Sequence, residues 1–395
     1  MRSDRVFSSA AALVIGVLGC GRDVESPTGP TSAGEAALAT SAAALAFSQL
    51  SGSGFNSCGV TTDFRAFCWG VNGLGELGDG TTIPRLTPVA VAGGHQFRQV
   101  STDGHHTCAL TTDNRAYCWG FNDSGELGDG TTTGRLTPVL VLGGLRFRQV
   151  DAGHDHTCGV TDPDGLAYCW GIGGALGDGT TTTRLIPVRV AGGHRFRQVS
   201  GGEAHTCAVT TSDEAYCWGS NRFGQVGDGG DVGVRLRPVL VAGGHAFQQV
   251  AAGFQHSCGV TTSHRAFCWG YGRLGQIGDG KTYLRFSPRA VAGGISFDRV
   301  SPGSGHTCAE TTTNGVYCWG NNQYGQLGDG TTTQRLTPVA VAGGISFSQV
   351  GTGGWHACGR TPVAVAYCWG GNFFGQLGDG TTTNRPTPVP LAGPM

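Results

Sequence analysis

One motif of about fifty residues recurs seven times along this chain and limits the folds that the chain can adopt. The copy from Phe297 to Pro338 is representative, and the tripeptide Cys-Trp-Gly marks the same point in every copy. Its tryptophans are Trp69, Trp119, Trp170, Trp218, Trp269, Trp319 and Trp369. A single copy is too small to bury its apolar faces alone, so such copies stack or close on one another. The sequence therefore predicts one repeat architecture rather than several unrelated domains.

Each copy is predicted to contribute four short strands. Runs of β-branched and aromatic residues alternate with Gly, Thr, Asp and Pro, and the 71 glycines argue against long helices. In the second copy the strands are expected over Phe97–Val100, His106–Thr111, Ala116–Gly120 and Thr137–Val141. The fold class that follows is all-β.

Fourteen of the fifteen cysteines form one pair per copy, on either side of a tight turn. The turn makes the second and third strands a hairpin, and symmetric closure of that hairpin places the two cysteines opposite each other, within reach of a disulfide. Each bridge is expected to contribute about 3 kcal/mol by restricting the unfolded chain. The predicted bridges are Cys58–Cys68, Cys108–Cys118, Cys158–Cys169, Cys207–Cys217, Cys258–Cys268, Cys308–Cys318 and Cys358–Cys368.

Zinc bound by the His-x-Cys pair and the second cysteine is the alternative for these residues. It requires seven near-identical metal sites and a cytosolic address, so we expect neither a metal nor a cofactor. The histidine of this motif is replaced by Asn56 in the first copy and is interpreted as a structural hydrogen-bonding group. The six histidines are His106, His156, His205, His256, His306 and His356.

A long connection of the form N-x-x-G-x-L-G-D-G-T-T-T-x-R follows Cys-Trp-Gly, and its Asp and Arg recur in all seven copies. One Asp supplies too few oxygens for a calcium loop, so the Asp is expected to cap a glycine turn. The Arg is expected to pair with that Asp or with loop carbonyls. The aspartates are Asp79, Asp129, Asp178, Asp228, Asp279, Asp329 and Asp379. The arginines are Arg85, Arg135, Arg184, Arg235, Arg285, Arg335 and Arg385.

Residues 1–19 resemble the signal peptide of a bacterial lipoprotein. A basic start precedes Val6–Val17, an apolar run shorter than the roughly 20 residues that a spanning helix needs. The following Leu-Gly-Cys20 resembles a lipobox, which implies cleavage before Cys20 and attachment of lipid to its thiol. An ordinary signal peptide with an incidental cysteine is the alternative.

The residue after the predicted lipid anchor, Gly21, resembles that of lipoproteins sent to an outer membrane. Residues 20–46 are rich in Ala, Ser, Thr, Gly and Pro, and a segment of this composition buries too little apolar surface to order itself. The sequence predicts a flexible tether there.

The motif G-x-x-H-T-C-A-x-T, followed by Y-C-W-G-x-N-x-x-G-Q-L-G-D-G, resembles the repeat of the regulator of chromosome condensation family. The resemblance covers residues 47–391, and the cysteines look like those of exported bacterial members. It implies a seven-bladed β-propeller with four antiparallel strands in each blade. Closure of the ring leaves only short, protected strand edges, which agrees with this reading.

The two ends of the repeat region predict how the ring closes. No T-P-V strand precedes Phe47, whereas Thr387–Leu391 supplies one at the other end. We expect residues 387–391 to complete the blade that begins at Phe47, with residues 392–395 as a C-terminal tail.

Function is expected where the copies differ, because repeated positions are occupied with the fold. Two loops per copy emerge at the same end of the strands, and they carry aromatic rings with a few charges, as protein-binding surfaces do. Packing of these rings between neighbouring blades is the alternative. The predicted partner-binding residues are Phe55, His105, His154, Asp155, Glu203, Phe223, Phe254, Gln255, Tyr271, Tyr324, Trp355 and Phe374.

Four of these residues, His105, His154, Asp155 and Glu203, lie on consecutive copies. A carbohydrate- or metal-binding cluster is one interpretation, and solvated loop residues are the other. Catalysis needs a convergent acid, base or nucleophile. The sequence identifies no such set, so we predict no catalytic residue and no enzyme.

The sequence favours a monomeric, envelope-anchored propeller that binds a protein or peptide. The net charge of −1 argues against nucleic acid as a partner. An inhibitor similar to the secreted propeller inhibitors of β-lactamases is the first alternative, and a carbohydrate-active enzyme is another. Guanine-nucleotide exchange, the role that names the family, is disfavoured because an exported chain does not meet a small GTPase.

Overall fold

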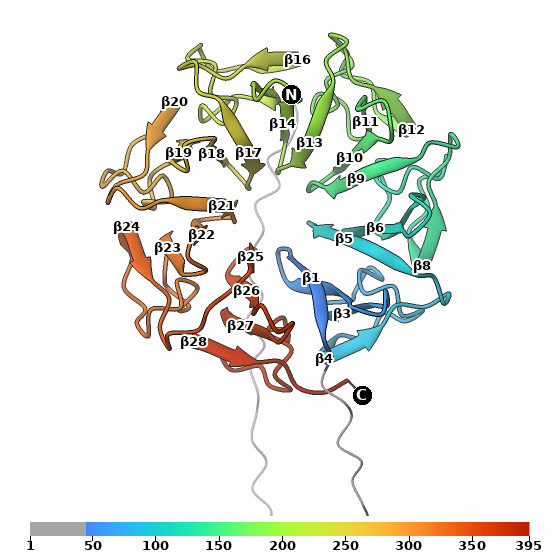
Figure 1. The fold of residues 1–395 in the computed structure, drawn as a ribbon. Coiled ribbons are helices and arrows are strands. Elements are labelled where there is room, and N and C mark those ends of the chain that lie inside the picture. Colours follow the sequence, from blue (N-terminus) through green and yellow to red (C-terminus); the bar gives the residue numbers. More distant parts are fainter. Residues whose placement is uncertain (1–44, 395) are drawn as a thin grey trace, which may run out of the picture. The chain divides into compact units, whose positions relative to one another are not determined.

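The computed structural model describes residues 45–394, in which the seven copies form seven four-stranded antiparallel sheets. The sheets are the blades of a ring (Figure 1). The predicted signal peptide, the lipid attachment at Cys20 and nearly all of the predicted tether lie outside the described residues.

Every blade contains its four strands in chain order. The first strands are β1 (Phe47–Gly52), β5 (Phe97–Asp103), β9 (Phe147–Ala152), β13 (Phe196–Gly201), β17 (Phe247–Ala252), β21 (Phe297–Pro302) and β25 (Gln349–Thr352). The second strands are β2 (Asn56–Thr61), β6 (His106–Thr111), β10 (His156–Thr161), β14 (His205–Thr210), β18 (His256–Thr261), β22 (His306–Thr311) and β26 (His356–Arg360).

The outer half of each blade is equally regular. The third strands are β3 (Ala66–Gly70), β7 (Ala116–Gly120), β11 (Ala167–Gly171), β15 (Ala215–Ser220), β19 (Ala266–Gly270), β23 (Val316–Gly320) and β27 (Ala366–Gly370). The fourth strands are β4 (Arg85–Ala90), β8 (Arg135–Leu140), β12 (Arg184–Arg189), β16 (Val234–Leu240), β20 (Arg285–Ala290), β24 (Arg335–Ala340) and β28 (Arg385–Pro390).

The first strand of every blade lies nearest the axis of the ring, and the fourth lies at the rim (Figure 1). The predicted all-β propeller with seven four-stranded blades is confirmed. Residues 45–394 include no helix that is long and apolar enough to cross a membrane.

The predicted closure of the ring is wrong. The C-terminal strand β28 pairs with β27 of its own blade, with Tyr367 opposite Pro390 and Cys368 opposite Val389. The T-P-V segment is therefore the last strand of each copy and leaves no spare strand at the end. Blade 7 meets blade 1 through the same contacts that join the other blades, such as the backbone hydrogen bond from Gly380 N to Leu86 O at 3.0 Å.

The hydrophobic core is divided among the seven seams, where a seam is the interface between neighbouring blades. In the first seam Val60, Leu77 and the Cys58–Cys68 bridge of blade 1 pack against Phe97 and Trp119 of blade 2. The tryptophan of every Cys-Trp-Gly is fully buried in this way. Apolar surface is thus buried mainly between blades, which explains why one copy alone is not expected to be stable.

All seven predicted disulfides are present. Each joins residues directly opposite in the second and third strands, with Cα atoms 4.0–4.1 Å apart. Every bridge lies in the core of a seam and is shielded from solvent. The register of the hairpin, rather than a metal, therefore accounts for these fourteen cysteines.

In six of the seven seams one backbone carbonyl of the long connection accepts hydrogen bonds from two side chains of the next blade. Glu76 O accepts from Trp119 Nε1 and from Thr107 Oγ1, both at 2.9 Å. The hydroxyl of the corresponding Thr157 in blade 3 accepts from His106 Nε2 of blade 2 at 2.7 Å, since it donates to Glu126 O. This arrangement requires the neutral imidazole with the proton on Nε2. The repeated histidine is a structural group, as the sequence indicated.

A second set of bonds joins the first strands around the axis. In six blades the glutamine of F-x-Q-V donates through Nε2 to a carbonyl of the next first strand at 2.7–3.0 Å. Its Oε1 accepts from the backbone N–H of the same residue at 2.8–3.3 Å. The glutamines are Gln49, Gln99, Gln149, Gln198, Gln249 and Gln349.

The seam between blades 6 and 7 departs from this pattern. Arg299 replaces the glutamine, and the buried Glu310 opposite it in β22 accepts the hydrogen bond from Val350 N instead. Burial raises the pKa of Glu310 to about 7. The same seam has Ala357 where other blades have Thr or Ser, and among the described residues no side chain or backbone atom bonds His306 Nε2. This seam is the least hydrogen-bonded of the seven.

We predict that Glu310→Val destabilises the protein by about 1–3 kcal/mol, because it leaves the buried Val350 N–H without an acceptor. Val is the residue at this position in blades 1, 3, 4 and 5. The double variant Arg299→Gln/Glu310→Val recreates the seam of those blades and should recover most of the loss. Urea unfolding measures both free energies. A double variant no more stable than Glu310→Val contradicts the assignment.

The buried histidines should make the protein sensitive to acid. Burial lowers their pKa values to about 3 or 4, whereas a histidine in the unfolded chain takes up its proton near pH 6.5. Each therefore removes up to about 1.4 kcal/mol of stability per pH unit as the pH falls below 6.5. His205→Asn, which copies Asn56 of blade 1, should flatten the decline relative to the unmodified protein. Urea unfolding at pH 7, 6, 5 and 4 measures the free energy of unfolding of both proteins. If the two free energies fall in parallel with pH, the buried histidine is not a cause of the acid sensitivity.

Candidate functional site

The loop face of the ring carries the loop between the first and second strands of each blade and the long connection between the third and fourth. Both loops leave the same end of their blade, because β1 ends, β2 begins and β3 ends there. The predicted partner-binding residues all belong to these loops. The structure thus places them on one face.

Ion pairs and hydrogen bonds from side-chain amides hold the long connections in place. The predicted Asp–Arg pair forms in all seven blades, with N–O distances of 2.6–2.8 Å in six of them. In blade 1, Asn72 donates to Asp79 Oδ1 and to two loop carbonyls, and it accepts from Leu77 N. Gly78 has a positive φ of 67° and lies against the ring of Trp119, where a Cβ atom would clash. The repeated residues therefore hold the loops rigid and leave the variable positions to present side chains.

Five aromatic side chains form one continuous patch over blades 6, 7 and 1. We call it the aromatic patch: Phe55, Tyr324, Trp355, Phe373 and Phe374. The centroid of Trp355 lies 5.0 Å from that of Phe55 and 5.5 Å from that of Tyr324. Phe374 lies 5.3 Å from Phe55, and Phe373 lies 4.9 Å from Tyr324. Four of the five were predicted as partner-binding residues, and the structure brings them together.

Exposure within the aromatic patch is uneven. Phe373 and Phe374 are 41% and 44% exposed, whereas Trp355 is half-buried among its neighbours. The backbone N–H of Phe374 donates to Gln376 Oε1 at 2.9 Å, and that of Tyr324 donates to Gln326 Oε1 in the same way. The outer rings are thus offered to solvent from turns that are already ordered, so their presentation costs little entropy on binding.

A second group, the histidine cluster, consists of His105, His154, Asp155 and Phe254 from blades 2, 3 and 5. The ring of His154 lies 5.5 Å from that of His105 and 5.9 Å from that of Phe254. Its Nδ1 lies 3.0 Å from Asp155 Oδ1, and this close contact with the carboxylate raises the pKa of His154 to about 9 despite burial. With this pKa the imidazole carries a positive charge at neutral pH.

The remaining predicted residues, Glu203, Phe223, Gln255 and Tyr271, belong to blades 4 and 5. Glu203 of blade 4 is half-buried, and burial raises its pKa while a hydrogen bond with Gln255 lowers it. Phe223 and Tyr271 of blades 4 and 5 form a separate pair with centroids 5.3 Å apart. Within residues 45–394, no three His, Cys, Asp or Glu side chains are grouped so as to hold a metal ion.

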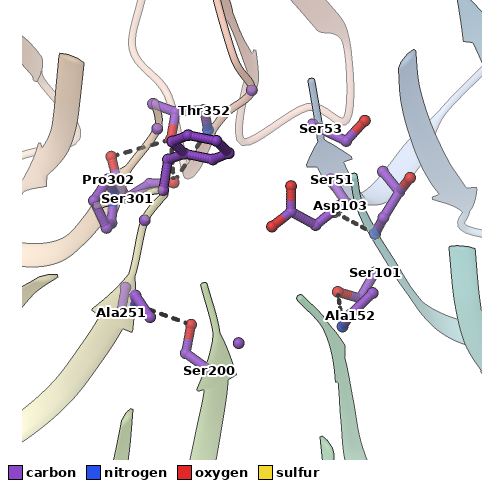
Figure 2. Close-up of a pocket in the computed structure, with 18 of the residues that line it drawn as sticks. Ser51, Ser53, Ser101, Asp103, Ala152, Ser200, Ala251, Ser301, Pro302 and Thr352 are labelled. Atoms are coloured by element: carbon purple, nitrogen blue, oxygen red, sulfur yellow. Dashed lines mark hydrogen bonds between the residues drawn. The ribbon is translucent and has the colours of Figure 1, made fainter. Parts of the chain in front are cut away.

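The sequence analysis missed two carboxylates that line a cavity on the axis. We call it the axial cavity; it has a volume of about 140 Å³ and is lined by the ends of the first strands (Figure 2). Asp103 and Asp151 contribute its only charged side chains. Position 151 is occupied by Ser, Ala or Gly in the other blades, and position 103 by Ser or Gly. This difference was visible in the sequence, but the strand that lines the axis was not.

The sequence profile of the RCC1-like domain matches residues 65–394. The chain belongs to the RCC1-like family. This assignment agrees with the family resemblance of the repeat and with the observed seven-bladed ring.

Among curated proteins, this RCC1-like chain is 42% identical over 69 residues to the human probable E3 ubiquitin-protein ligase HERC4. It is 40% identical over 75 residues to the Arabidopsis thaliana ultraviolet-B receptor UVR8. These stretches cover 17% and 18% of the chain, and only 6% and 17% of the two relatives. The likeness is confined to a short part of each relative.

Solved structures resemble this RCC1-like chain over most of its length. Prp20p of Saccharomyces cerevisiae has a TM-score of 0.75 at 20% identity, with 88% of this chain and 87% of that one covered. Human WBSCR16 has a TM-score of 0.74 at 21% identity, with 83% and 94% covered. At this identity the likeness shows the shared fold.

The ion pair of the histidine cluster predicts the effect of removing its carboxylate. Asp155→Asn should lower the pKa of His154 from about 9 by about one unit or more, since the hydrogen bond to the carboxylate is the largest cause of the shift. Glu203→Gln should lower it less, because Glu203 acts only at a distance. NMR titration of the imidazole Cε1–H signal measures both. An unchanged midpoint in Asp155→Asn contradicts the pairing.

Proposed function

We propose that this protein is a non-catalytic propeller that binds a protein or peptide through its loop face. The aromatic patch carries the proposal, because it offers contiguous, partly exposed rings on ordered turns. Binding energy at protein interfaces is concentrated in such aromatic anchors. The loops around the patch supply a polar rim, as interfaces require.

Related propellers support binding of proteins. Prp20p has been studied for its binding to Gsp1p and histones, and yeast RCC1 (Prp20) has been crystallised with Kap60 bound. Those partners belong to those proteins. For this chain the shared fold supports a protein as the class of ligand, and the identity of the partner follows from the loops in which the relatives differ.

The proposal includes a location in the cell envelope. Seven buried disulfides suit an oxidising compartment, where such bridges form and persist. The lipobox-like segment ending at Cys20 supports export and a lipid anchor, and Gly21 supports an outer membrane. The protein is proposed to act there as a monomer, and an enzyme outside the cytoplasm, as in the propeller inhibitors of β-lactamases, is one kind of partner.

The test compares two pairs of substitutions, each of which truncates two exposed apolar side chains. Phe373→Ala/Phe374→Ala truncates the exposed part of the patch, whereas Phe64→Ala/Val363→Ala truncates exposed side chains on hairpin turns at the opposite end of the blades. A partner captured from envelope extract should bind the first variant at least about tenfold more weakly, since anchor residues cost more than 1 kcal/mol each when truncated.

Calorimetry with the purified partner measures the two dissociation constants. The second variant should bind as the unmodified protein does. Equal binding by both variants, or a loss confined to the second, disproves the assignment of the loop face.

A further inference from the structure

The axial cavity opens on the loop face, next to the aromatic patch. Ser53 and Gly354 line the cavity, and Phe55 and Trp355 of the patch follow them closely in the chain. Asp103 points into the hollow between the first strands (Figure 2). A ligand that covers the patch therefore also covers the mouth of the cavity.

Asp103 and Asp151 form no direct ion pair among the described residues, although the His154 cation acts on Asp103 from a distance and Arg299 lines an adjoining hollow on the axis together with Asp151. No Lys, Arg or His lines the cavity, and no ion pair includes Asp103 or Asp151. Each carboxylate accepts one backbone hydrogen bond, from Gly104 N at 2.8 Å and from Gly201 N at 2.9 Å respectively. The rest of each carboxylate's hydrogen-bonding capacity is available to a ligand.

The charge of Asp151 exceeds what the seam requires. In other blades a serine at this position accepts the same backbone hydrogen bond: Ser51 from Thr102 N, Ser101 from Ala152 N, and Ser200 from Ala252 N. A neutral hydroxyl is thus sufficient for the fold. Burial raises the pKa of Asp151 to about 8 and that of Asp103 to about 6, and His154 and the backbone hydrogen bond from Gly104 offset part of the rise at Asp103.

The surroundings of the cavity are acidic as well. Asp155 and Glu203 lie near Asp103 on the loop face, and their charges act on it or on its neighbour His154. His154 is the only cation of this group and is already paired with Asp155. With the carboxylates ionised, the mouth therefore carries a net negative charge although the whole chain carries only −1.

The chemistry of the cavity suits a cationic group. Carboxylates bind ammonium and, more strongly, guanidinium groups by charge-assisted hydrogen bonds. A cavity of about 140 Å³ has room for several water molecules, which is enough for the end of one long side chain.

We infer that the protein partner inserts an arginine or lysine side chain into the axial cavity, between Asp103 and Asp151, while neighbouring apolar residues of the same segment pack on the aromatic patch. This inference rests on the proposed function, because it names the chemistry of the segment that the loop face binds. Arginine fits the cavity best, since its planar guanidinium can bond two carboxylates at once.

The experiment selects random twelve-residue peptides displayed on phage against the purified protein. Selected peptides should be enriched in Arg or Lys next to large apolar residues. Synthetic copies then measure affinity for Asp103→Asn/Asp151→Asn, in which the amide oxygens still accept the two backbone bonds. Binding should weaken at least about tenfold, as expected when the partner of a buried charge is removed.

A matched variant removes two carboxylates elsewhere. Asp63→Asn/Asp113→Asn changes two residues on exposed hairpin turns at the opposite end of the blades. This variant should bind the peptide with an affinity within about twofold of the unmodified protein, because surface charges contribute little. Affinity for the unmodified protein should also rise from pH 6 to pH 9, as Asp103 and Asp151 ionise and His154 loses its proton. Replacing the basic residue of the peptide by norleucine should abolish both effects.

The outcomes separate the inference from the proposed function. Selected peptides that lack basic residues but lose affinity in Phe373→Ala/Phe374→Ala overturn the inference and leave the proposed function standing. Equal loss of affinity in the two Asp variants also overturns the inference. Failure to select any peptide that depends on either the patch or the cavity counts against both.

Discussion

A single carbonyl oxygen in each long connection holds the ring together. It accepts from an indole N–H of the next blade and, in every seam except that between blades 6 and 7, from a hydroxyl of that blade as well. In the first seam this acceptor is Glu76 O, with Trp119 and Thr107 as donors. All groups involved are buried, so each of these bonds replaces a hydrogen bond to water that the group loses on folding. Because the acceptor lies in the same connection that forms the loop face, the fold and the binding surface depend on the same peptide units.

This coupling explains why the aromatic patch is ordered before any ligand arrives. In blade 7, Gln376 offers its carbonyl to Trp69 and Ser57 of blade 1, and its side chain accepts from Phe374 N. The residue that anchors the loop to the next blade thus also fixes the turn that presents Phe374. A surface of this kind binds without first paying the entropy of ordering its loops.

Much of this fold could be predicted because its determinants are local. The spacing of the paired cysteines fixes the register of each hairpin, and the number of repeat copies gives the number of blades. The way in which the ring closes could not be predicted, because the T-P-V strand can be read as the last strand of one copy or as the first strand of the next. The pairing of Pro390 with Tyr367 shows that it is the last strand of its own copy. The sequence named most residues of the loop face, but not their grouping into a patch across blades 6, 7 and 1. Asp103 and Asp151 were missed because ring geometry, rather than local pattern, determines which strand faces the axis.

Every blade consists of one continuous stretch of chain, β1–β4 through β25–β28, with no strand exchanged between the two ends. A duplication or deletion of one repeat in the gene therefore adds or removes a whole sheet together with its disulfide, and cuts no hydrogen-bonded ladder. Rings with fewer or more blades are accessible by recombination alone. Their size is limited by the angle between neighbouring blades, which must bring the last blade back to the first.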